Sequence, residues 1–333
     1  MKSEFEKLME RHLGPRGVLP ENQINAHLGD EPIMRVGVPQ RSGALALNAT
    51  LKQYPVMVSA NAYWDPKKQC FNIPEHTPLI DANVAVDSAG FVAMMLFKSK
   101  GLQSGMCGVF PWSYEQYLTF ANLMRPAWYS APDMCCEPQA VSGQDEIDWR
   151  IDATGTLLEG CMRVLYEWQD QLAKGGCNTQ TITDLVRIPV PIVQGWSISD
   201  YLASLELTLQ VWERWQPWVA PPALMGLGSV CRRDLHHPEH GLFAILEQLE
   251  GRLPKGTKLH LFGVKGAALD RVRMYDFVAS FDSMGWDYGA RRQALRSGMS
   301  NTMGHRIGKM NEWMSKATER MRPKAGDQFR LSF

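Results

Sequence analysis

Short, almost uninterrupted apolar runs recur along the chain and alternate with longer segments in which apolar residues repeat at helical spacing. Such runs are typical of parallel strands whose two faces are both buried. We expect strands in YPVMVSANA (54–62), LIDANVAV (79–86), AWYSA (127–131), RIPVPIV (187–193), PPALMGLG (221–228), LHLFGV (259–264) and FVASF (277–281). The alternation of strand and helix predicts an α/β fold built from parallel βα units.

Helices are expected between these strands. We predict YEQYLTFANLM after Pro111, a long helix from Glu146 to about Lys174, one that starts at Ser197, and one from about His240 to Leu253. Ser197 and Asp200 have the spacing of a capping box. With the weaker N-terminal strands the chain has seven or eight βα units, which predicts a (β/α)8 TIM barrel with insertions.

Six strand-like runs end in an acidic, amide or glycine residue: Asp87, Asp133, Gln194, Gly228, Gly263 and Asp282. A barrel of parallel strands gathers its strand C-termini at one mouth, so we expect these residues to converge on one pocket. Asp282 and Asp87 can act as nucleophile and general acid/base in a displacement at a sugar carbon. Asp133 can read a base edge, since a carboxylate accepts from two N–H groups together. On spacing alone, helix caps or buried ion-paired acids are equal alternatives.

Length and composition indicate an ordinary globular protein with one large core, since 45% of its 333 residues are hydrophobic and 21% are charged. No apolar run is long enough to cross a membrane, and the N-terminus MKSEFEKLMERHLG lacks the apolar region of a signal peptide. We therefore expect a cytoplasmic protein without membrane contact. The seven cysteines are scattered, which favours reduced thiols.

The end of the chain is basic although the net charge is zero. Residues 291–324 contain nine Lys or Arg and two acids. We expect a barrel domain over 1–290, with its catalytic motifs in 80–290, and a basic helical C-terminal extension over 291–333. A basic segment of this kind suits binding to a phosphate backbone, and the alternative is a helix whose charges are solvated. The candidate backbone contacts are Arg232, Arg233, Lys265, Arg291 and Arg292.

Other residues near Asp282 have simpler expected roles. Asp276 precedes the strand FVASF and should lie at the opposite end of the barrel. Asp287 suits a surface ion pair or a loop cap. Trp286 and Tyr288 are candidates for stacking on a flipped base or its neighbour, with core packing as the alternative.

Six motifs together resemble those of tRNA-guanine transglycosylases, in the same order over residues 80–290. DSAGF (87–91) resembles DSGGF, PDMC (132–135) resembles FDEC, and IVQGW (192–196) resembles IVQGG. GLGSV (226–230) takes the place of GGLAVGE, HLFGV (260–264) resembles HYLMGVG, and FDSMGW (281–286) falls where FDCVLPTR carries the nucleophile.

The resemblance implies a role for each matching residue. Asp282 would be the nucleophile and Asp87 the general acid/base. The residues expected to bind the base are Asp133, Gln194, Gly195, Gly228, Ser229, Phe91 and Phe262. Backbone N–H groups around Gly228 and Ser229 are expected to approach the base closely, since glycine leaves room there.

The chain departs from the tRNA enzymes after the nucleophile. Those enzymes carry a CxCxxC and a histidine that form a structural zinc site, whereas no cysteine here follows Cys231. We therefore expect no zinc subdomain, no metal and no cofactor. Cys231 with His236, His237 and His240 is an alternative metal site of irregular spacing.

GSVCRR (228–233) and MGWDYGARR (284–292) resemble the DpdA branch, the DNA-guanine transglycosylases of bacterial modification clusters and phages. That resemblance implies exchange of a flipped guanine in DNA for a 7-deazaguanine base such as preQ0 (7-cyano-7-deazaguanine), through a covalent aspartyl-deoxyribosyl intermediate. It also implies a bacterial or phage-encoded enzyme, with other modification-cluster proteins as further partners. The alternatives are a zinc-less tRNA enzyme and a non-catalytic nucleic-acid-binding paralogue.

Overall fold

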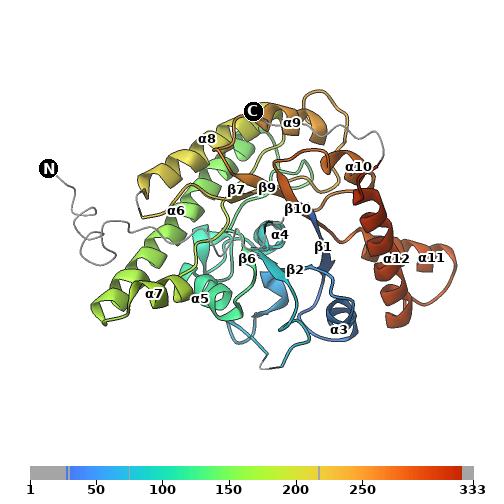
Figure 1. Ribbon diagram of the computed structural model, residues 1–333, viewed down its shortest axis with the longest axis horizontal. Helices are drawn as coiled ribbons and strands as arrows, with labels where there is room; N and C mark the ends of the chain where they lie inside the picture. Colours follow the sequence, from blue (N-terminus) through green and yellow to red (C-terminus); the bar gives the residue numbers. More distant parts are fainter. Residues whose placement is uncertain (1–27, 29–30, 75, 217, 325–333) are drawn as a thin grey trace.

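Eight parallel strands form one curled sheet in the computed structural model, which describes residues 28, 31–74, 76–216 and 218–324. The strand order is β6-β5-β2-β1-β10-β9-β8-β7. The strands are β1 (Ile33–Val38), β2 (Val56–Ser59), β5 (Val84–Asp87), β6 (Trp128–Tyr129), β7 (Ile192–Val193), β8 (Leu224–Leu227), β9 (Lys258–Leu261) and β10 (Val278–Ser283). Figure 1 looks onto this ring of strands, with helices around it.

The two edges of the sheet meet next to β6 and β7. Ser130 forms a parallel bridge with Val190. The Val190 N–H donates to the Tyr129 carbonyl, and the Ala131 N–H donates to the Val190 carbonyl, both at 2.8 Å. The strands therefore follow chain order around a barrel, and the predicted (β/α)8 fold is confirmed.

Ten α-helices are described around and beyond the strands. They are α3 (Ala44–Leu51), α4 (Gly90–Lys100), α5 (Tyr114–Met124), α6 (Gln144–Lys174), α7 (Thr179–Leu185), α8 (Ile198–Arg214), α9 (Leu242–Leu249), α10 (Leu269–Val272), α11 (Gly285–Arg296) and α12 (Met303–Met321). Short 3₁₀ turns η2 (Ala60–Ala62), η3 (Met106–Gly108) and η4 (Gly266–Ala268) and a hairpin of β3 (Trp64–Asp65) and β4 (Cys70–Phe71) complete the connections.

Most of the predicted helices and strands are present, and several are shorter than expected. Helix α5 has the predicted bounds, and α8 begins with the predicted capping box of Ser197 and Asp200. Helix α9 is shorter than expected, because Gly251 adopts a left-handed conformation just beyond its end. Most predicted strands are longer than the observed ones, since only the residues at the C-terminal side of runs such as LIDANVAV pair with neighbours. Strand β10 is the exception, because it ends two residues beyond the predicted FVASF. The sequence patterns did not indicate β1.

Side chains of the strands pack in two separate layers. Val84 and Val86 of β5 face the helices, whereas Ala85 between them faces the barrel interior. That interior also contains Trp128 and Ile192. Burial on both faces explains the near-continuous apolar runs of the sequence.

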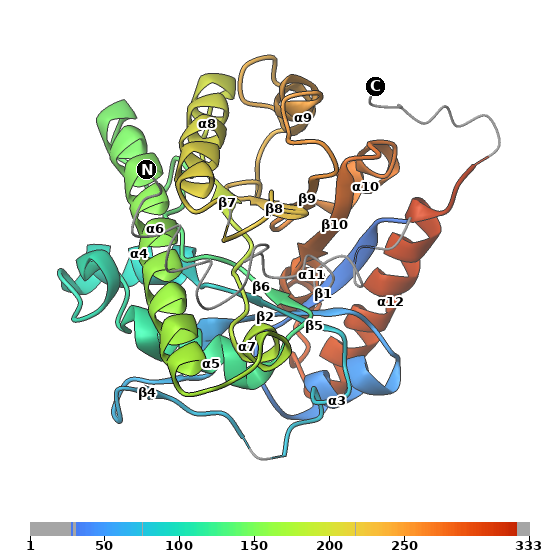
Figure 2. The same cartoon turned by 60° about the vertical axis from the view of Figure 1, so that its left-hand side comes forward.

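The C-terminal helices pack on the barrel. Helix α11 follows β10 directly, so the expected boundary at residue 290 falls inside a helix. Helix α12 lies beside β1 and α3 (Figure 2) and buries Met310, Met314 and Ala317. The part of the basic extension that the structure describes is thus helical and contributes to the core. None of the described helices is long and apolar enough to span a membrane.

Candidate active site

The mouth of the barrel brings together carboxylates from different strand ends. Asp87 is the last residue of β5, Asp282 lies near the end of β10, and Asp133 follows β6. Burial raises the pKa of Asp87 to about 7, and the negative charges of Asp133 and Asp282 add to the effect. Asp87 can therefore exchange a proton near neutral pH, as a general acid/base requires.

Asp282 is held in a fixed orientation through one of its oxygens. Oδ1 accepts a hydrogen bond from the Gly263 N–H at 2.9 Å and lies 3.4 Å from Nε2 of His260. Gly263 adopts a left-handed φ of 76°, which favours glycine. Within the described ranges, Oδ2 has no protein hydrogen-bond donor. It is the carboxylate oxygen that remains free to act as a nucleophile or a base.

His260 lies beneath Asp282 and was not predicted as a site residue. It is fully buried, with its ring 4.7 Å from Trp128 and 4.6 Å from Phe262 between centroids. Burial lowers the pKa of His260, which keeps the ring neutral at pH 7. Nδ1 lies 2.8 Å from the Ser280 hydroxyl, so a hydrogen bond from that hydroxyl leaves the proton on Nε2, facing Asp282.

A buried arginine also lies in the barrel interior. Arg35 is paired in register with Asp282 on the neighbouring strand, and its guanidinium is 5.6 Å from the Trp128 ring centroid. Burial lowers its pKa to about 10, and the charge of Asp282 opposes that shift, so Arg35 stays cationic at neutral pH. A charged residue within the apolar run IMRVGV was the signal that could have identified it.

Asp133 is buried in a chain of side-chain hydrogen bonds. The Ser88 hydroxyl donates to Oδ1 at 2.6 Å, and the Gln194 amide donates to Oδ2. The Ser229 hydroxyl in turn donates to the Gln194 carbonyl at 2.6 Å. Burial raises the pKa of Asp133 to about 6, although the hydrogen bonds from Ser88 and Gln194 act against this shift. Each carboxylate oxygen keeps a second lone pair for a base N–H.

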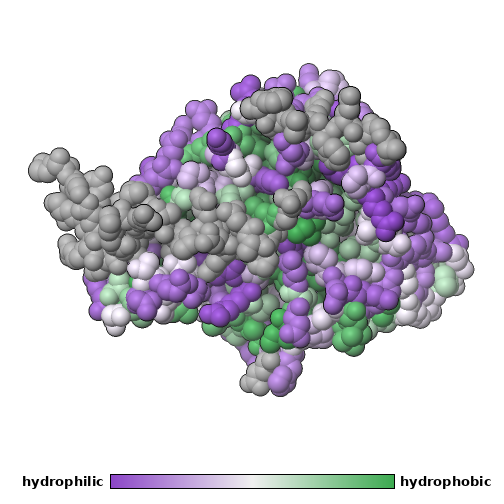
Figure 3. All heavy atoms as spheres, in the orientation of Figure 1, coloured by the Kyte–Doolittle hydropathy of each residue, from purple (hydrophilic) through white to green (hydrophobic). Residues whose placement is uncertain are grey.

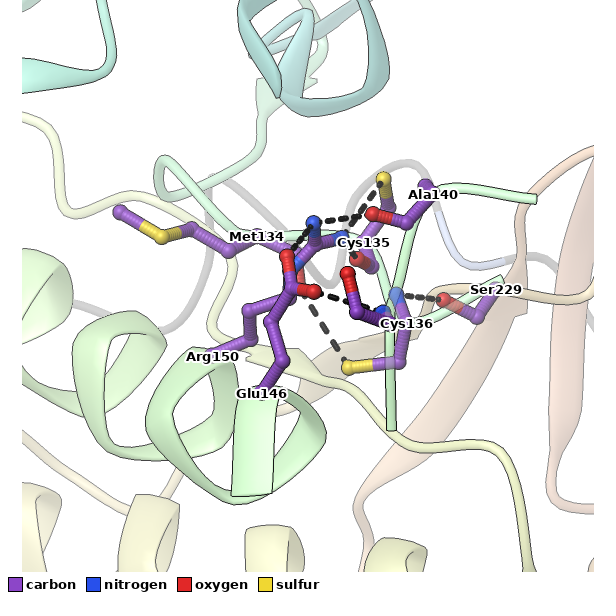
Figure 4. A network of polar contacts seen from close by, with 8 residues as sticks. Met134, Cys135, Cys136, Ala140, Glu146, Arg150 and Ser229 are labelled. Atoms are coloured by element: carbon purple, nitrogen blue, oxygen red, sulfur yellow. Dashed lines mark hydrogen bonds and ion pairs between the residues drawn. The ribbon is translucent and has the colours of Figure 1, made fainter. Parts of the chain in front are cut away.

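The loop that carries Asp133 is fixed by α6 (Figure 4). The Met134 N–H donates to the Thr154 hydroxyl at 3.0 Å. The fully buried Arg150 donates to the carbonyls of Cys135 and Ala140 and forms an ion pair with Glu146 at 2.5 Å. Across the mouth, the Cys136 N–H donates to the Ser229 hydroxyl at 2.7 Å. Sequence reasoning missed Arg150, because its partners are backbone carbonyls.

Gly228 and Gly195 allow close packing of the residues around them. A Cβ at Gly228 would lie 2.2 Å from the Gln194 amide nitrogen. The Gly228 N–H donates to the Val193 carbonyl at 3.0 Å, which corrects the expectation that this N–H meets the base. A Cβ at Gly195 would lie 2.8 Å from Cβ of Asp200, so this glycine lets the start of α8 approach.

The two predicted aromatic contacts lie on different elements. Phe262 is partly buried beside Trp128 and His260 at the end of β9. Phe91 lies in the first turn of α4, just after Asp87, and is 42% exposed. Trp286 is not available to a base, because it is buried and its Nε1 donates to the Gly37 carbonyl at 3.0 Å.

Arg233 is not a phosphate contact, which corrects its predicted role. Its side chain is buried, and its guanidinium lies 4.0 Å from the Trp196 ring centroid. All five N–H groups of a guanidinium can donate. Here the five acceptors are the carbonyls of Ser229, Trp196, His240 and Gly195 and the hydroxyl of Tyr201. Arg233 therefore fastens the loop after β8 to α8.

The other predicted basic residues are exposed. Arg232 lies beside Cys231, and the Lys265 amine donates to the Arg233 carbonyl at 2.6 Å. Arg291 is paired with Asp287, a buried residue that also pairs with Arg306 at 2.8 Å. Asp287 is thus an ion-pair residue as expected, but a buried one. Asp276 precedes β10, at the opposite end of that strand from Asp282.

The alternative metal site does not form. The described residues contain no group of three or more His, Cys, Asp or Glu side chains placed to hold a metal ion. His237 and His240 stack on each other with centroids 3.4 Å apart, and His240 also stacks on Trp196.

Comparison with protein families gives a match that covers most of the chain. A model described as DpdA, DeoxyPurine in DNA protein A, matches residues 68–328. A search of curated proteins gave no match. The matched segment runs from the β3–β4 hairpin to beyond α12 and includes all three mouth aspartates. The chain therefore belongs to the DpdA family.

Proposed function

We propose that the protein is a DNA-guanine transglycosylase that replaces guanine in DNA with a 7-deazaguanine base such as preQ0. The proposal rests on two carboxyl groups that lie in the same mouth. Asp282 is oriented by the Gly263 N–H, and Asp87 has a raised pKa. Membership of a family named for deoxypurine in DNA supports DNA as the substrate.

In the first half-reaction, Asp282 Oδ2 attacks C1′ of a guanine nucleotide that has been flipped out of the stack. The bond between C1′ and N9 breaks, its electron pair leaves with the base, and Asp87 supplies the proton that neutralises guanine. An ester between Asp282 and the deoxyribose results. The Gly263 N–H and His260 hold Oδ1, which becomes the ester carbonyl oxygen.

In the second half-reaction, the incoming 7-deazaguanine attacks C1′ with N9. Asp87, now ionised, accepts the N9 proton, and Asp282 leaves as a carboxylate. Two inversions restore the original configuration at C1′. Asp133 and Gln194 hold each base in turn, and we assign Phe91 and Phe262 to its faces. The exchange requires neither a nucleoside triphosphate nor a redox reagent.

The test is a base-exchange assay with purified protein, preQ0, and either duplex DNA or tRNA, with nucleosides read by mass spectrometry. We expect 7-deazaguanine nucleoside from DNA only, and none with Asp282→Asn, while this variant binds DNA like the parent. Incorporation into tRNA alone, or full activity of Asp282→Asn, would refute the proposal.

A further inference from the structure

Helix α11 has an outer face that points away from the barrel. The helix buries Trp286, Asp287, Ala290 and Ala294 against its neighbours. On the other side, Tyr288 is 60% exposed and Leu295 is 84% exposed, and Arg292 and Arg296 lie on the same exposed side. Figure 1 shows α11 beside α12 at the edge of the molecule, and in Figure 3 this edge is mainly hydrophilic with pale patches.

Two arginines, Arg292 and Arg296, carry the positive charge of this face that no described ion pair offsets. Between Asp287 and Glu312 the sequence contains five Lys or Arg and no acid. Asp287 itself is buried and already neutralised by Arg291 and Arg306. Among the residues that the structure describes, no carboxylate forms an ion pair with Arg292 or Arg296. Such a face attracts a polyanion.

An exposed stacking pair lies within the positive face. The Arg292 guanidinium carbon is 5.4 Å from the Tyr288 ring centroid. Nucleic-acid bases stack on aromatic rings and on guanidinium planes, largely without regard to sequence. An aromatic ring that is 60% exposed and flanked by arginines fits an unstacked base next to a phosphate.

This face begins at the mouth. Helix α11 starts directly after β10, the strand of Asp282, and its N-cap Met284 is 40% exposed. Met284 also lies against the end of β1, where a Cβ added to Gly37 would be 2.3 Å from its Cγ. The exposed side of α11 therefore continues outward from the rim above the nucleophile.

We infer that the outer face of α11 binds the DNA strand that flanks the flipped guanine. Tyr288 stacks on a base next to the extruded nucleotide, and Arg292 and Arg296 contact phosphates. This inference rests on the proposed function, since it takes DNA as the substrate of the mouth. In this arrangement the outer face of α11 orients the DNA, and Tyr288 supports the base next to the extruded one.

The experiment measures binding of the full chain to a fluorescent guanine-containing duplex over a series of salt concentrations. We expect Tyr288→Ala to weaken binding about tenfold without changing the salt dependence, because stacking is not ionic. Tyr288→Phe should bind like the parent. The double variant Arg292→Ala/Arg296→Ala should make the negative slope of log K against log salt shallower by about 1.8, or 0.9 per phosphate.

Matched controls lie on α6, where Trp149 is 45% exposed and the Arg163 side chain is 69% exposed. Trp149→Ala and Arg163→Ala should bind like the parent. The inference is overturned if the α11 variants behave like these controls, or if they change the oligomeric state and not DNA binding. If the protein exchanges bases but the α11 variants bind DNA like the parent, only this inference is refuted. If the α11 variants weaken DNA binding but the protein does not exchange bases, the proposed chemistry is refuted and the DNA-binding role of α11 stands.

Discussion

At the residue scale, the two oxygens of Asp282 have different surroundings. Oδ1 is held by the Gly263 N–H and faces Nε2 of His260, whereas Oδ2 is open toward the mouth. Under the proposed mechanism, donors that stay on Oδ1 would stabilise the carboxylate each time it leaves the sugar. Arg35 lies on the neighbouring strand β1, in register with Asp282.

His260 should therefore act by positioning the nucleophile. Removing its hydrogen bond in His260→Phe should slow single-turnover exchange about 10- to 100-fold, which corresponds to about 1.5–3 kcal/mol for a hydrogen bond to a charged group. The apparent affinity for preQ0 should change little. His260→Gln, which retains a donor, should recover part of the rate. Equal losses in both variants would contradict this role.

The raised pKa of Asp87 makes a prediction about stability as a function of pH. A carboxyl whose folded pKa is about 7 binds its proton more tightly in the folded state, so its ionisation removes stability between about pH 4 and pH 7. Asp87→Asn should therefore melt at a higher temperature than the parent above pH 7, with the difference vanishing near pH 4. Thermal melts at both pH values check this. A difference that is equal at the two pH values would show that Asp87 has an ordinary pKa.

At the element scale, α6 and α8 hold in place the loops that carry Asp133 and Ser229. Arg150 of α6 fastens the loop after Asp133 through the Cys135 and Ala140 carbonyls, and Arg233 fastens the loop after β8 to α8. Both guanidinium groups are buried and donate mainly to backbone. They are therefore structural parts of the site, although Arg233 was expected to contact a phosphate backbone.

Helix α6 offers a matched pair of arginine variants. Arg150 and Arg163 each form an ion pair with the glutamate four residues earlier, but the Arg150 side chain is fully buried and that of Arg163 is 69% exposed. Arg150→Met should lower the free energy of unfolding by about 3–5 kcal/mol, because Glu146 and the loop carbonyls lose a buried partner. Arg163→Met should change it by less than about 0.5 kcal/mol. Urea unfolding measures both, and similar losses would contradict the assigned role of Arg150.

Sequence patterns predicted the elements and the strand ends better than the contacts of individual side chains. Apolar runs located seven of the strands, because burial on both faces leaves a direct compositional signal. They did not indicate β1, which contains the charged Arg35. Arg233 was assigned to the nucleic-acid backbone, and Trp286 was a candidate for base stacking as well as for core packing, because residue type does not reveal orientation. Each instead has its polar groups bonded to backbone carbonyls from distant segments.

At the scale of the whole molecule, the acidic mouth of the barrel adjoins a positive surface on α11. The mouth contains three aspartates, whereas the residues that follow β10, the strand of Asp282, are basic and exposed on α11. Under the proposed function, such a layout would attract the phosphate backbone to the rim while the base and its sugar reach the carboxylates. Closure of the barrel between Ser130 and Val190 fixes the distances among these strand ends.

The central claim is that Asp282 becomes bonded to the sugar of DNA. The direct measurement is to denature the protein during turnover on a short duplex, digest it, and find by mass spectrometry which peptide carries a nucleotide adduct. The account predicts an adduct on the peptide that contains Asp282, and its loss in Asp282→Asn. An adduct on another residue, or exchange that proceeds normally in Asp282→Asn, would contradict it.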